Sequence, residues 1–208
     1  FVNADCVNIA ANDATYRDSP ASMDWVFVDG IGMRIAGWLL NQPVRDNVNG
    51  TDLFPRLCEA LARHGRSLYL LGGRPGIADA AADWARNRFP GLQIAGSHDG
   101  YFDADDTDAV VAEIQGTHPD VLLVAMGVPV QEAWMARHAR STGATVTLGV
   151  GGLFDYYSGR IPRAPLWMRR LGLEWAFRLL QEPGRLWRRY LVGNVVFLAR
   201  IGRDRLGR

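Results

Sequence analysis

One carboxylate in this chain directly follows an apolar run and could take part in proton transfer. Asp29 comes after Trp25–Val28, so it is expected at the end of a buried strand. A carboxylate there can remove a proton as a general base when its pKa suits the reaction, or it can cap the turn that follows. Asp52, in the segment Val48–Leu53, has the same two interpretations, and helix capping is the commoner use of such a residue.

Glycine-rich turns follow most of the apolar runs. Glycine lets the backbone approach a ligand closely, and the free amides at a helix start favour phosphate. One such loop can simply be a tight strand-to-helix turn, but several on one sheet edge indicate a ligand site. None has the G-x-G-x-x-G spacing with an acid placed for a ribose, so a dinucleotide-dependent oxidoreductase is poorly supported. The candidate substrate-binding residues in these turns are Gly72, Gly73, Arg74, Gly127, Gly151 and Gly152.

The sequence predicts neither a metal site nor a cofactor. The acids of Asp103–Asp106 resemble the metal-binding cluster of many sugar-nucleotide enzymes, but they follow Gly100–Phe102 in a surface turn, and we interpret them as solvated. The four histidines are scattered without the spacing of metal ligands. No nucleophile elbow and no P-loop are present.

The charge of the chain is strongly divided. Residues 160–208 hold twelve arginines against three acids, a formal charge near +9, whereas the preceding 159 residues hold eleven arginines against nineteen acids. The basic segment is also rich in tryptophan, tyrosine and phenylalanine. Such a segment suits an anionic membrane surface, a phosphate-bearing ligand or nucleic acid.

The remaining composition favours a reduced, cytoplasmic protein. Its two cysteines, Cys6 and Cys58, lie in ordinary apolar runs. No secretory signal is recognisable, and no apolar run reaches the roughly 20 residues of a spanning helix. The chain opens directly on an apolar run, which suggests that residues before it are missing. We therefore expect a protein that lies on a membrane without crossing it.

The elements that position these residues follow an alternating pattern. Such a pattern predicts an α/β fold, a doubly wound, mostly parallel Rossmann-like sheet. We expect a body of residues 1–158 and a basic, helical, membrane-associating appendage of residues 159–208, whose removal leaves the body folded. The expected strands are Phe1–Val2, Trp25–Val28, Ser67–Leu71, Leu92–Gly96, Val121–Ala125 and Thr145–Val150. The expected helices are Asn3–Ala14, Gly32–Leu40, Asp52–His64, Ile77–Phe89, Asp105–Thr117 and Pro129–Ser141.

Taken together, the motifs resemble one family over essentially the whole chain, the WecG/TagA/CpsF bacterial glycosyltransferases. Each motif alone is weak, and their order makes the signal strong. In the body they are Phe1–Ala4, Val28–Gly32, Val48–Leu53, Leu70–Gly73, Ser97–Phe102, Met126–Glu132 and Gly149–Gly152. In the tail they are Arg163–Pro165, Gly172–Trp175, Arg178–Leu179, Glu182–Pro183 and Arg185–Tyr190.

The resemblance implies an inverting transfer of a sugar from a nucleotide sugar, usually a UDP-sugar, to a polyprenyl-diphosphate-linked sugar. Such enzymes build cell-surface polysaccharides on the cytoplasmic face of the plasma membrane and are thought to need no metal. Partners would be the donor, the acceptor and an anionic membrane surface, with a homo-oligomer possible. Donor sugar, acceptor sugar and polymer are left open by the sequence.

The resemblance also assigns residues. The family's catalytic base matches Asp29, and its conserved amide matches Gln131, with Glu132 beside it. Asn3 matches an asparagine near the first strand. Two positions depart from the family pattern: Phe1 replaces a common threonine and Asn47 a common arginine, so the contacts of that threonine and arginine with donor or acceptor do not transfer to this chain. Tail residues implied to bind substrate phosphates are Arg163, Arg178, Arg185 and Arg189.

Arginines of the tail would stabilise the departing diphosphate, since their planar guanidinium groups pair with phosphate oxygens. A second hypothesis is a non-catalytic nucleotide-sugar or nucleic-acid binding domain, because interleaved arginines and aromatics suit single strands. A third is a structural membrane adaptor. The high apolar content of the tail disfavours nucleic acid, and the presence of both Asp29 and Gln131 disfavours the two non-catalytic hypotheses.

Overall fold

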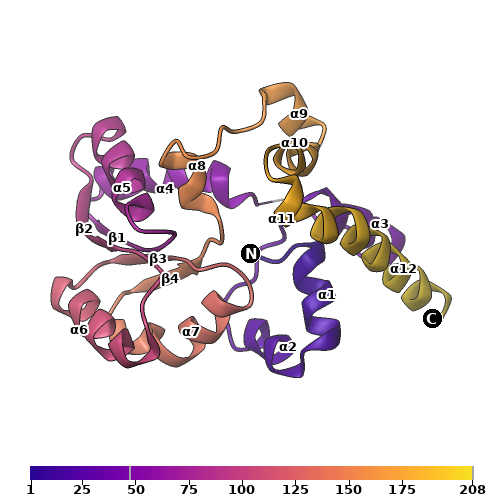
Figure 1. Cartoon of the computed structure of the whole chain (residues 1–208), viewed down its shortest axis with the longest axis horizontal. Coiled ribbons are helices and arrows are strands. Elements are labelled where there is room, and N and C mark those ends of the chain that lie inside the picture. Colours follow the sequence, from indigo (N-terminus) through magenta and orange to yellow (C-terminus); the bar gives the residue numbers. More distant parts are fainter. Residues whose placement is uncertain (47, 208) are drawn as a thin grey trace. The chain divides into compact units, whose positions relative to one another are not determined.

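The computed structural model describes residues 1–46 and 48–207 (Figure 1). Their contacts divide the chain into two compact units. The terminal unit comprises Phe1–Asn49 and Pro162–Arg208, and the sheet unit comprises Gly50–Ile161. These boundaries differ from those of the expected parts, 1–158 and 159–208, because the N-terminal segment packs with the C-terminal one.

The sheet unit contains a four-stranded parallel sheet with strand order β2-β1-β3-β4. The strands are β1 (Ser67–Gly72), β2 (Gln93–His98), β3 (Val121–Ala125) and β4 (Val146–Gly149). In the central strands, Leu68–Leu71 and Val121–Ala125 are buried, as continuous apolar runs predict for strands covered on both faces. The predicted α/β class with a parallel sheet is confirmed.

Helices cover both faces of this sheet (Figure 1). One face carries α4 (Gly50–Arg63), α5 (Ile77–Arg88) and α8 (Leu153–Tyr157). The other carries α6 (Thr107–Thr117) and α7 (Val130–His138), which the short helices η1 (Ala104–Asp106) and η2 (Ala139–Thr142) adjoin. Phe54 of α4, Ala81 of α5 and Phe154 of α8 fill the core on the first face. Small alanines on α5 let this helix lie close to the strands.

The first two expected strands do not join the sheet, and this part of the prediction is wrong. Val2 and Val28 form one isolated parallel bridge. The extended segments are short because a helix begins at Ala4 and another at Ile31. Trp25 is also 75% exposed, so the apolar run before Asp29 is not buried on both faces.

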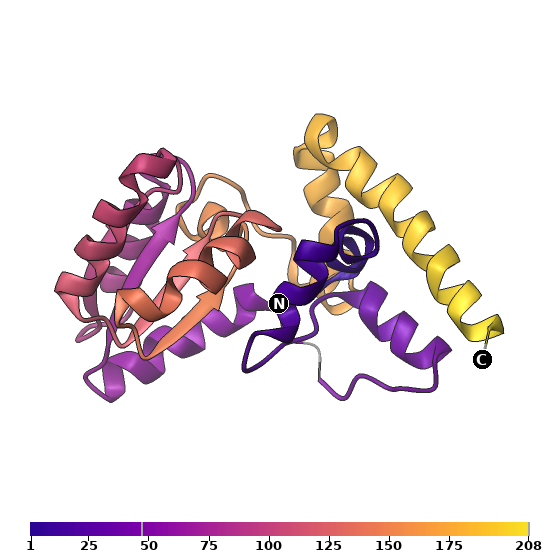
Figure 2. The ribbon, with the colours of Figure 1, turned by 90° about the horizontal axis from the view of Figure 1, so that it is seen from below.

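The terminal unit is helical. Its elements are α1 (Ala4–Asn12), α2 (Ala14–Ala21), α3 (Ile31–Leu39), α9 (Leu166–Arg170), α10 (Glu174–Gln181), α11 (Pro183–Trp187), the π-helix η3 (Arg188–Val192) and α12 (Gly193–Leu206). In Figure 2, α12 is the long yellow helix, and it packs on both α1 and α3. Of the described helices, none combines the length and the apolar character that a membrane span requires.

The C-terminal segment contributes to the core of this unit. Phe197 and Ile201 of α12 are buried against Ala36 of α3. The side-chain amide of Asn8 in α1 donates a 2.7 Å hydrogen bond to the carbonyl of Gly193. These contacts tie the chain's last helix to its first, so the basic segment is part of a packed unit rather than a separate extension.

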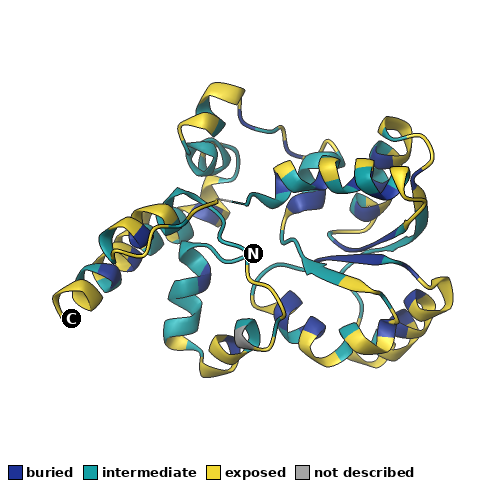
Figure 3. Ribbon diagram, turned by 180° about the vertical axis from the view of Figure 1, so that it is seen from behind, coloured by how far each residue is buried: buried dark blue, intermediate teal, exposed yellow. Residues whose placement is uncertain are grey.

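Most large apolar side chains that are exposed in the described residues belong to the terminal unit. In Figure 3, much of α9 and α12 is coloured as exposed. The large apolar side chains of the terminal unit that are more than half exposed are Trp25, Trp38, Leu166, Trp167, Leu171, Leu180, Leu191, Val195 and Leu206. Exposure on this scale is typical of surfaces that meet another apolar partner.

Candidate active site

Asn3 and Asp29 lie on two backbone segments that are hydrogen-bonded to each other. The N–H of Asp29 donates a 2.9 Å bond to the carbonyl of Val2, next to Asn3. The side-chain oxygen of Asn3 accepts from the N–H groups of Asp5 and Cys6, at 3.0 and 3.3 Å, and so caps α1. Asp29 is half-buried beside this capped helix start.

The chain turns into α3 immediately after Asp29. Gly30 occupies the N-cap position of this helix with a φ of 94°, a value that other residues rarely adopt. A Cβ at Gly30 would meet no atom within 4 Å. The tight turn therefore places the carboxylate of Asp29 at the start of α3, with open space next to the turn.

Two of the candidate arginines share one acid. Arg178 lies 3.8 Å from Glu182, measured between Nε and Oε2, and Arg185 forms a closer ion pair with the same carboxylate. Arg163 pairs with Glu174 at 3.1 Å, and both side chains are about four-fifths buried. A guanidinium has five N–H donors, so an arginine held by one acid retains donors for phosphate.

Arg189 connects the C-terminal segment with α1. Its Nε lies 3.0 Å from Oδ2 of Asp5, in the first turn of the helix that Asn3 caps. Its guanidinium also lies over the ring of Tyr190, 5.6 Å from the centroid. The structure therefore places Arg189 and Asn3 at the same end of α1.

Local spacing could have revealed some of these acidic partners. Arg178 and Glu182 are four residues apart, and Glu182 and Arg185 are three apart, with Glu182 at the junction of α10 and α11. Side chains at such short spacings are often close together. No comparable signal links Asp5 to Arg189, which only the packing of η3 near α1 brings together.

Two other predicted residues do not join these groups. Asn47 lies outside the described residues. Asp52 is exposed in the first turn of α4, which begins at Gly50, and an acid there stabilises the positive end of the helix dipole.

In the sheet unit, two glycines at the end of β1, Gly72 and Gly73, allow close packing. A Cβ at Gly72 would lie 2.5 Å from backbone atoms of Ala125 in β3, and one at Gly73 would lie 2.8 Å from Ile77. The N–H of Gly73 donates a 2.9 Å bond to the carbonyl of Ala125. Arg74 follows as an exposed side chain at the carboxyl end of β1.

The glycines after β3 and β4 have a different environment. Gly127 and Gly151 have φ values of 80° and 57°, and an added Cβ would meet no atom within 4 Å at either position. Gly152 follows as the N-cap residue of α8. The structure therefore leaves open space beside the backbone at these two turns, where the sequence predicts a ligand site.

Gln131 and Glu132 form a buried polar pair at the start of α7. Gln131 is 2% exposed, and its side-chain amide donates a 2.8 Å bond to Glu132, which is 8% exposed. The other end of the amide accepts a 2.9 Å bond from the N–H of Gly151. Burial raises the pKa of Glu132, whose Oε2 is buried without a hydrogen-bond partner. Gln131 thus fixes the open turn after β4.

The structure assigns the predicted residues to two sets. The glycines, Arg74, Gln131 and Glu132 belong to the carboxyl edge of the sheet. Asp29, Asn3 and the tail arginines belong to the terminal unit. The expectation that Asp29 follows a strand of the same sheet is therefore incorrect, because its segment forms an isolated bridge with Val2 and lies outside the four-stranded sheet.

No cluster that could hold a metal ion, meaning three or more His, Cys, Asp or Glu side chains, occurs within residues 1–46 and 48–207. The acids Asp103–Asp106 are exposed at and before η1. Chemically, the chain offers a half-buried carboxylate, several fixed guanidinium groups and an accessible glycine-rich sheet edge. This combination suits the transfer of a group away from a diphosphate.

Comparison with known proteins shows which family the chain belongs to. The model of the family described as "Glycosyl transferase WecG/TagA/CpsF family" matches residues 1–208. The N-acetylglucosaminyldiphosphoundecaprenol N-acetyl-beta-D-mannosaminyltransferase of Bacillus subtilis (strain 168) is 33% identical over 190 residues, 91% of this chain and 73% of that protein. The enzyme of the same name from Staphylococcus aureus (strain MW2) is 31% identical over 186 residues, 89% of this chain and 72% of that protein. The chain is therefore a glycosyltransferase that belongs to the WecG/TagA/CpsF family.

Proposed function

We propose that this enzyme transfers N-acetylmannosamine from UDP-N-acetylmannosamine to N-acetylglucosamine linked through diphosphate to undecaprenol, in the synthesis of a cell-surface polymer. The observation that carries the proposal is the similarity to N-acetylmannosaminyltransferases over about nine-tenths of the chain. The proposal names the donor and acceptor that the sequence left open.

Asp29 is the proposed general base. Its carboxylate would take the proton from the acceptor hydroxyl while that oxygen attacks the anomeric carbon of the donor sugar. The bond from this carbon to the diphosphate then breaks, and UDP leaves with the electron pair, which inverts the configuration. The half-buried position at the tight Gly30 turn supports this role.

Arginines are the proposed source of positive charge for the departing diphosphate. Arg163, Arg178, Arg185 and Arg189 are held in place by acidic partners in the terminal unit. Preorganised cations stabilise charge that develops in the transition state without reorganising. The ion pairs with Glu174, Glu182 and Asp5 supply this preorganisation.

The glycine-rich sheet edge is the proposed donor subsite. The open backbone at Gly127 and Gly151 gives the nucleotide close access. Gln131, which the resemblance implies to be catalytic, is proposed to act by positioning, because both ends of its amide hold neighbouring groups. Arg74 adds an exposed cation at the same edge.

We further propose that the protein is cytoplasmic and binds the inner face of the plasma membrane through the terminal unit. Exposed Trp167, Leu171 and Leu180 accompany the arginines of the C-terminal segment. Tryptophans favour the headgroup depth of a bilayer, and each arginine near an anionic surface contributes about 1 kcal/mol. This surface would keep the enzyme close to its lipid-linked acceptor.

The test is a transfer assay with purified protein, UDP-N-acetylmannosamine and a polyprenyl-diphosphate-linked N-acetylglucosamine. Mass spectrometry should detect the lipid-linked disaccharide, and NMR should show the β linkage. Activity is expected to persist in EDTA. Faster turnover of UDP-N-acetylglucosamine or UDP-glucose would overturn the donor assignment, and products without inversion would overturn the mechanism.

A further inference from the structure

Helix α3 is apolar on two faces, and only one of them is packed in the core. Met33 and Ala36 face α12 and contribute to the core around Phe197. On another face, Ile35 is 41% exposed and Trp38 is 73% exposed. A helix that is apolar on all sides is normally buried, so an exposed second apolar face indicates a surface that binds something apolar.

A second wall stands beside this face because the chain folds back after α3. Asn41 takes a left-handed conformation with a φ of 56°, and the N–H of Gln42 donates a 2.8 Å bond to the carbonyl of Gly37. A Cβ at Gly37 would lie 2.6 Å from the carbonyl oxygen of Gln42 and 3.0 Å from Val44. The glycine therefore allows the returning segment to run close to the helix.

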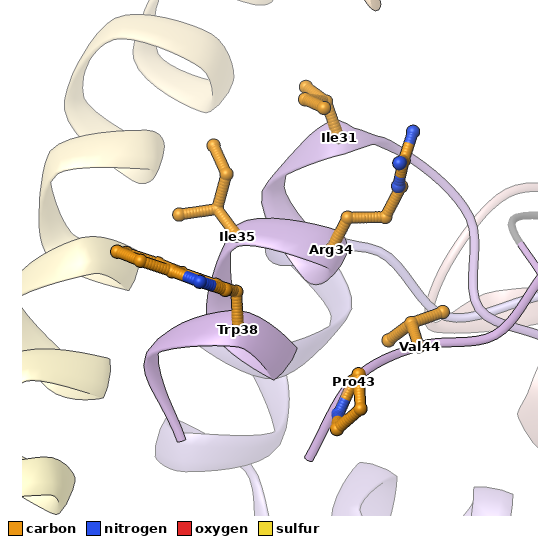
Figure 4. A pocket seen from close by; sticks show the side chains of 6 residues that line it. All are labelled: Ile31, Arg34, Ile35, Trp38, Pro43 and Val44. Atoms are coloured by element: carbon orange, nitrogen blue, oxygen red, sulfur yellow. The ribbon is translucent and has the colours of Figure 1, made fainter. Parts of the chain in front are cut away.

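Together the helix face and the returning segment form an open groove of about 380 Å³ within the terminal unit (Figure 4). This volume lies in the range of small-molecule sites, roughly 300–1,000 Å³. The lining residues are Ile31, Arg34, Ile35, Trp38, Pro43 and Val44. Arg34 is the one charged residue among these six, and all the others offer apolar surface.

This lining complements a ligand with an apolar chain and an anionic head. We propose that the groove, at its α3 face, holds the first isoprene units of the polyprenyl diphosphate, with Arg34 pairing with the diphosphate. The inference rests on the proposed function, since it concerns the acceptor of that reaction. It adds a binding site for the lipid part of the acceptor, separate from the arginines assigned to the departing UDP.

The order of groups along α3 fits this arrangement. Asp29 stands just before the helix, Arg34 lies in its first turn and Trp38 one turn further on. With a rise of about 1.5 Å per residue, Arg34 is roughly 5 Å and Trp38 roughly 10 Å along the axis from Ile31. Base, cation and apolar wall thus follow in the order of sugar hydroxyl, diphosphate and isoprenoid chain.

Two arginines also precede, in the sequence, a contact at the start of α3. Gly172 packs so closely on Ile31 that an added Cβ would lie 3.0 Å from the isoleucine Cβ. Arg169 and Arg170 form the last turn of α9, directly before this contact. The segment that packs on the start of α3 thus carries two arginines just before the contact, whereas Trp38, Pro43 and Val44 give the groove an apolar lining.

Binding of water-soluble probes to the full chain tests this directly. We would titrate farnesyl diphosphate, inorganic diphosphate and farnesol by calorimetry. Trp38→Ala should weaken farnesyl diphosphate about tenfold or more and leave inorganic diphosphate unchanged, since it removes only apolar contact. Arg34→Gln should weaken both diphosphates about tenfold, since it removes a charge-assisted pair.

Matched controls separate the groove from general surface effects. Trp25→Ala removes a tryptophan of similar exposure, 75% against 73%, outside the groove. Arg140→Gln removes an exposed arginine of η2. Neither control should change the affinity for farnesyl diphosphate. Equal losses in Trp25→Ala and Trp38→Ala would overturn the proposal.

The outcomes also distinguish this proposal from the proposed function. If the enzyme transfers sugar to a polyprenyl acceptor and Trp38→Ala leaves the KM for that acceptor unchanged, the proposed function stands. The proposal that the groove binds the lipid is then overturned. Binding of farnesyl diphosphate that depends on Trp38, without transfer of N-acetylmannosamine, would do the reverse. Trp38-dependent binding to phosphatidylglycerol vesicles, with no binding of farnesyl diphosphate, would show a membrane contact and overturn the proposed occupant.

Discussion

The N–H of Gly151 donates a 2.9 Å hydrogen bond to the side-chain oxygen of Gln131. The same amide donates to Glu132 at 2.8 Å, so one buried side chain links the start of α7 with the turn after β4. Gly149 makes this possible, because a Cβ there would lie 3.0 Å from the amide nitrogen of Gln131. The open turn of the proposed donor subsite therefore depends on a residue that is itself almost inaccessible.

Replacing this amide should destabilise the sheet unit. Gln131→Ala removes the partner of the half-buried N–H of Gly151 and of the buried carboxylate of Glu132, and a buried polar group left unpaired costs about 1–3 kcal/mol. Denaturant unfolding should show a loss of about 2–4 kcal/mol. Gln115→Ala, on the exposed side of α6, is the control and should stay within about 0.5 kcal/mol. Equal stability of the two variants would contradict the bridging role.

Glu132 should make stability depend on pH. Burial raises the pKa of its carboxyl in the folded state above the ordinary value of roughly 4.3, so the folded protein binds more protons than the unfolded chain over this window. Stability from the protonated form is present at low pH and is lost as pH rises through the folded-state pKa.

Glu132→Gln tests this effect, since it removes the titrating group and keeps an oxygen that can accept from Gln131. The free energy of unfolding of the variant, relative to that of the wild type, should increase as pH rises from about 4.3. This difference should become constant above the folded-state pKa of Glu132. A constant difference from pH 4 to 8 would show that Glu132 does not titrate in this way.

Asp29→Asn should abolish transfer while leaving the fold and UDP binding intact. General-base catalysis typically contributes about 10²–10⁴-fold, so turnover should fall at least a hundredfold. Asp24→Asn, an exposed acid of the same unit, should retain wild-type turnover. Retention of a tenth of the activity in Asp29→Asn would remove the aspartate from the mechanism.

Truncating a core residue of α12 should strongly destabilise the terminal unit. Phe197 is 1% exposed, and its truncation to alanine should cost about 3–5 kcal/mol. Val195→Ala, at 68% exposure, should cost little.

Because α12 covers α1 and α3, deletion of residues from 162 onward should also unfold these helices. A deletion variant with intact α1 and α3 helicity by NMR would refute this.

Arginines that are oriented by an acidic partner should contribute more to turnover than an exposed arginine near the chain's end. Arg178→Gln and Arg185→Gln each remove a guanidinium oriented by Glu182, and each should lower turnover about tenfold or more. Arg203→Gln removes the same charge from an exposed position near the chain's end and should change turnover less than twofold. Equal effects in all three variants would mean that only the total charge matters.

The amino-acid sequence predicted the four strands of the sheet unit and its longer helices, but neither α8 nor the strand order. Continuous apolar runs such as Val121–Ala125 identify strands buried on both faces, and the predicted bounds of that strand coincide with β3. The glycine-rich turns were equally readable, because tight strand-to-helix connections have strong local requirements. The order of motifs identified the family.

Tertiary structure decided what local patterns do not contain. The run Trp25–Val28 looks like a buried strand, yet it forms one isolated bridge with Val2 in place of a sheet, and Trp25 stays exposed. The apolar residues of α3 have the spacing of a core helix. In the structure, α12 packs on the face that carries Ala36, whereas the face that carries Ile35 and Trp38 lines an open groove.

Arg189 and Asp5 illustrate the same limit for two residues that lie near opposite ends of the chain. Composition and helical spacing report on neighbours within a few residues, whereas this 3.0 Å ion pair depends on how η3 and α1 pack. The sequence by itself determined the family and the parallel α/β class, and it supplied the candidate residues of the proposed site. The assembly of the first and last segments into one unit is a property of long-range packing, since it arises from burial of Phe197 and Ile201 against Ala36.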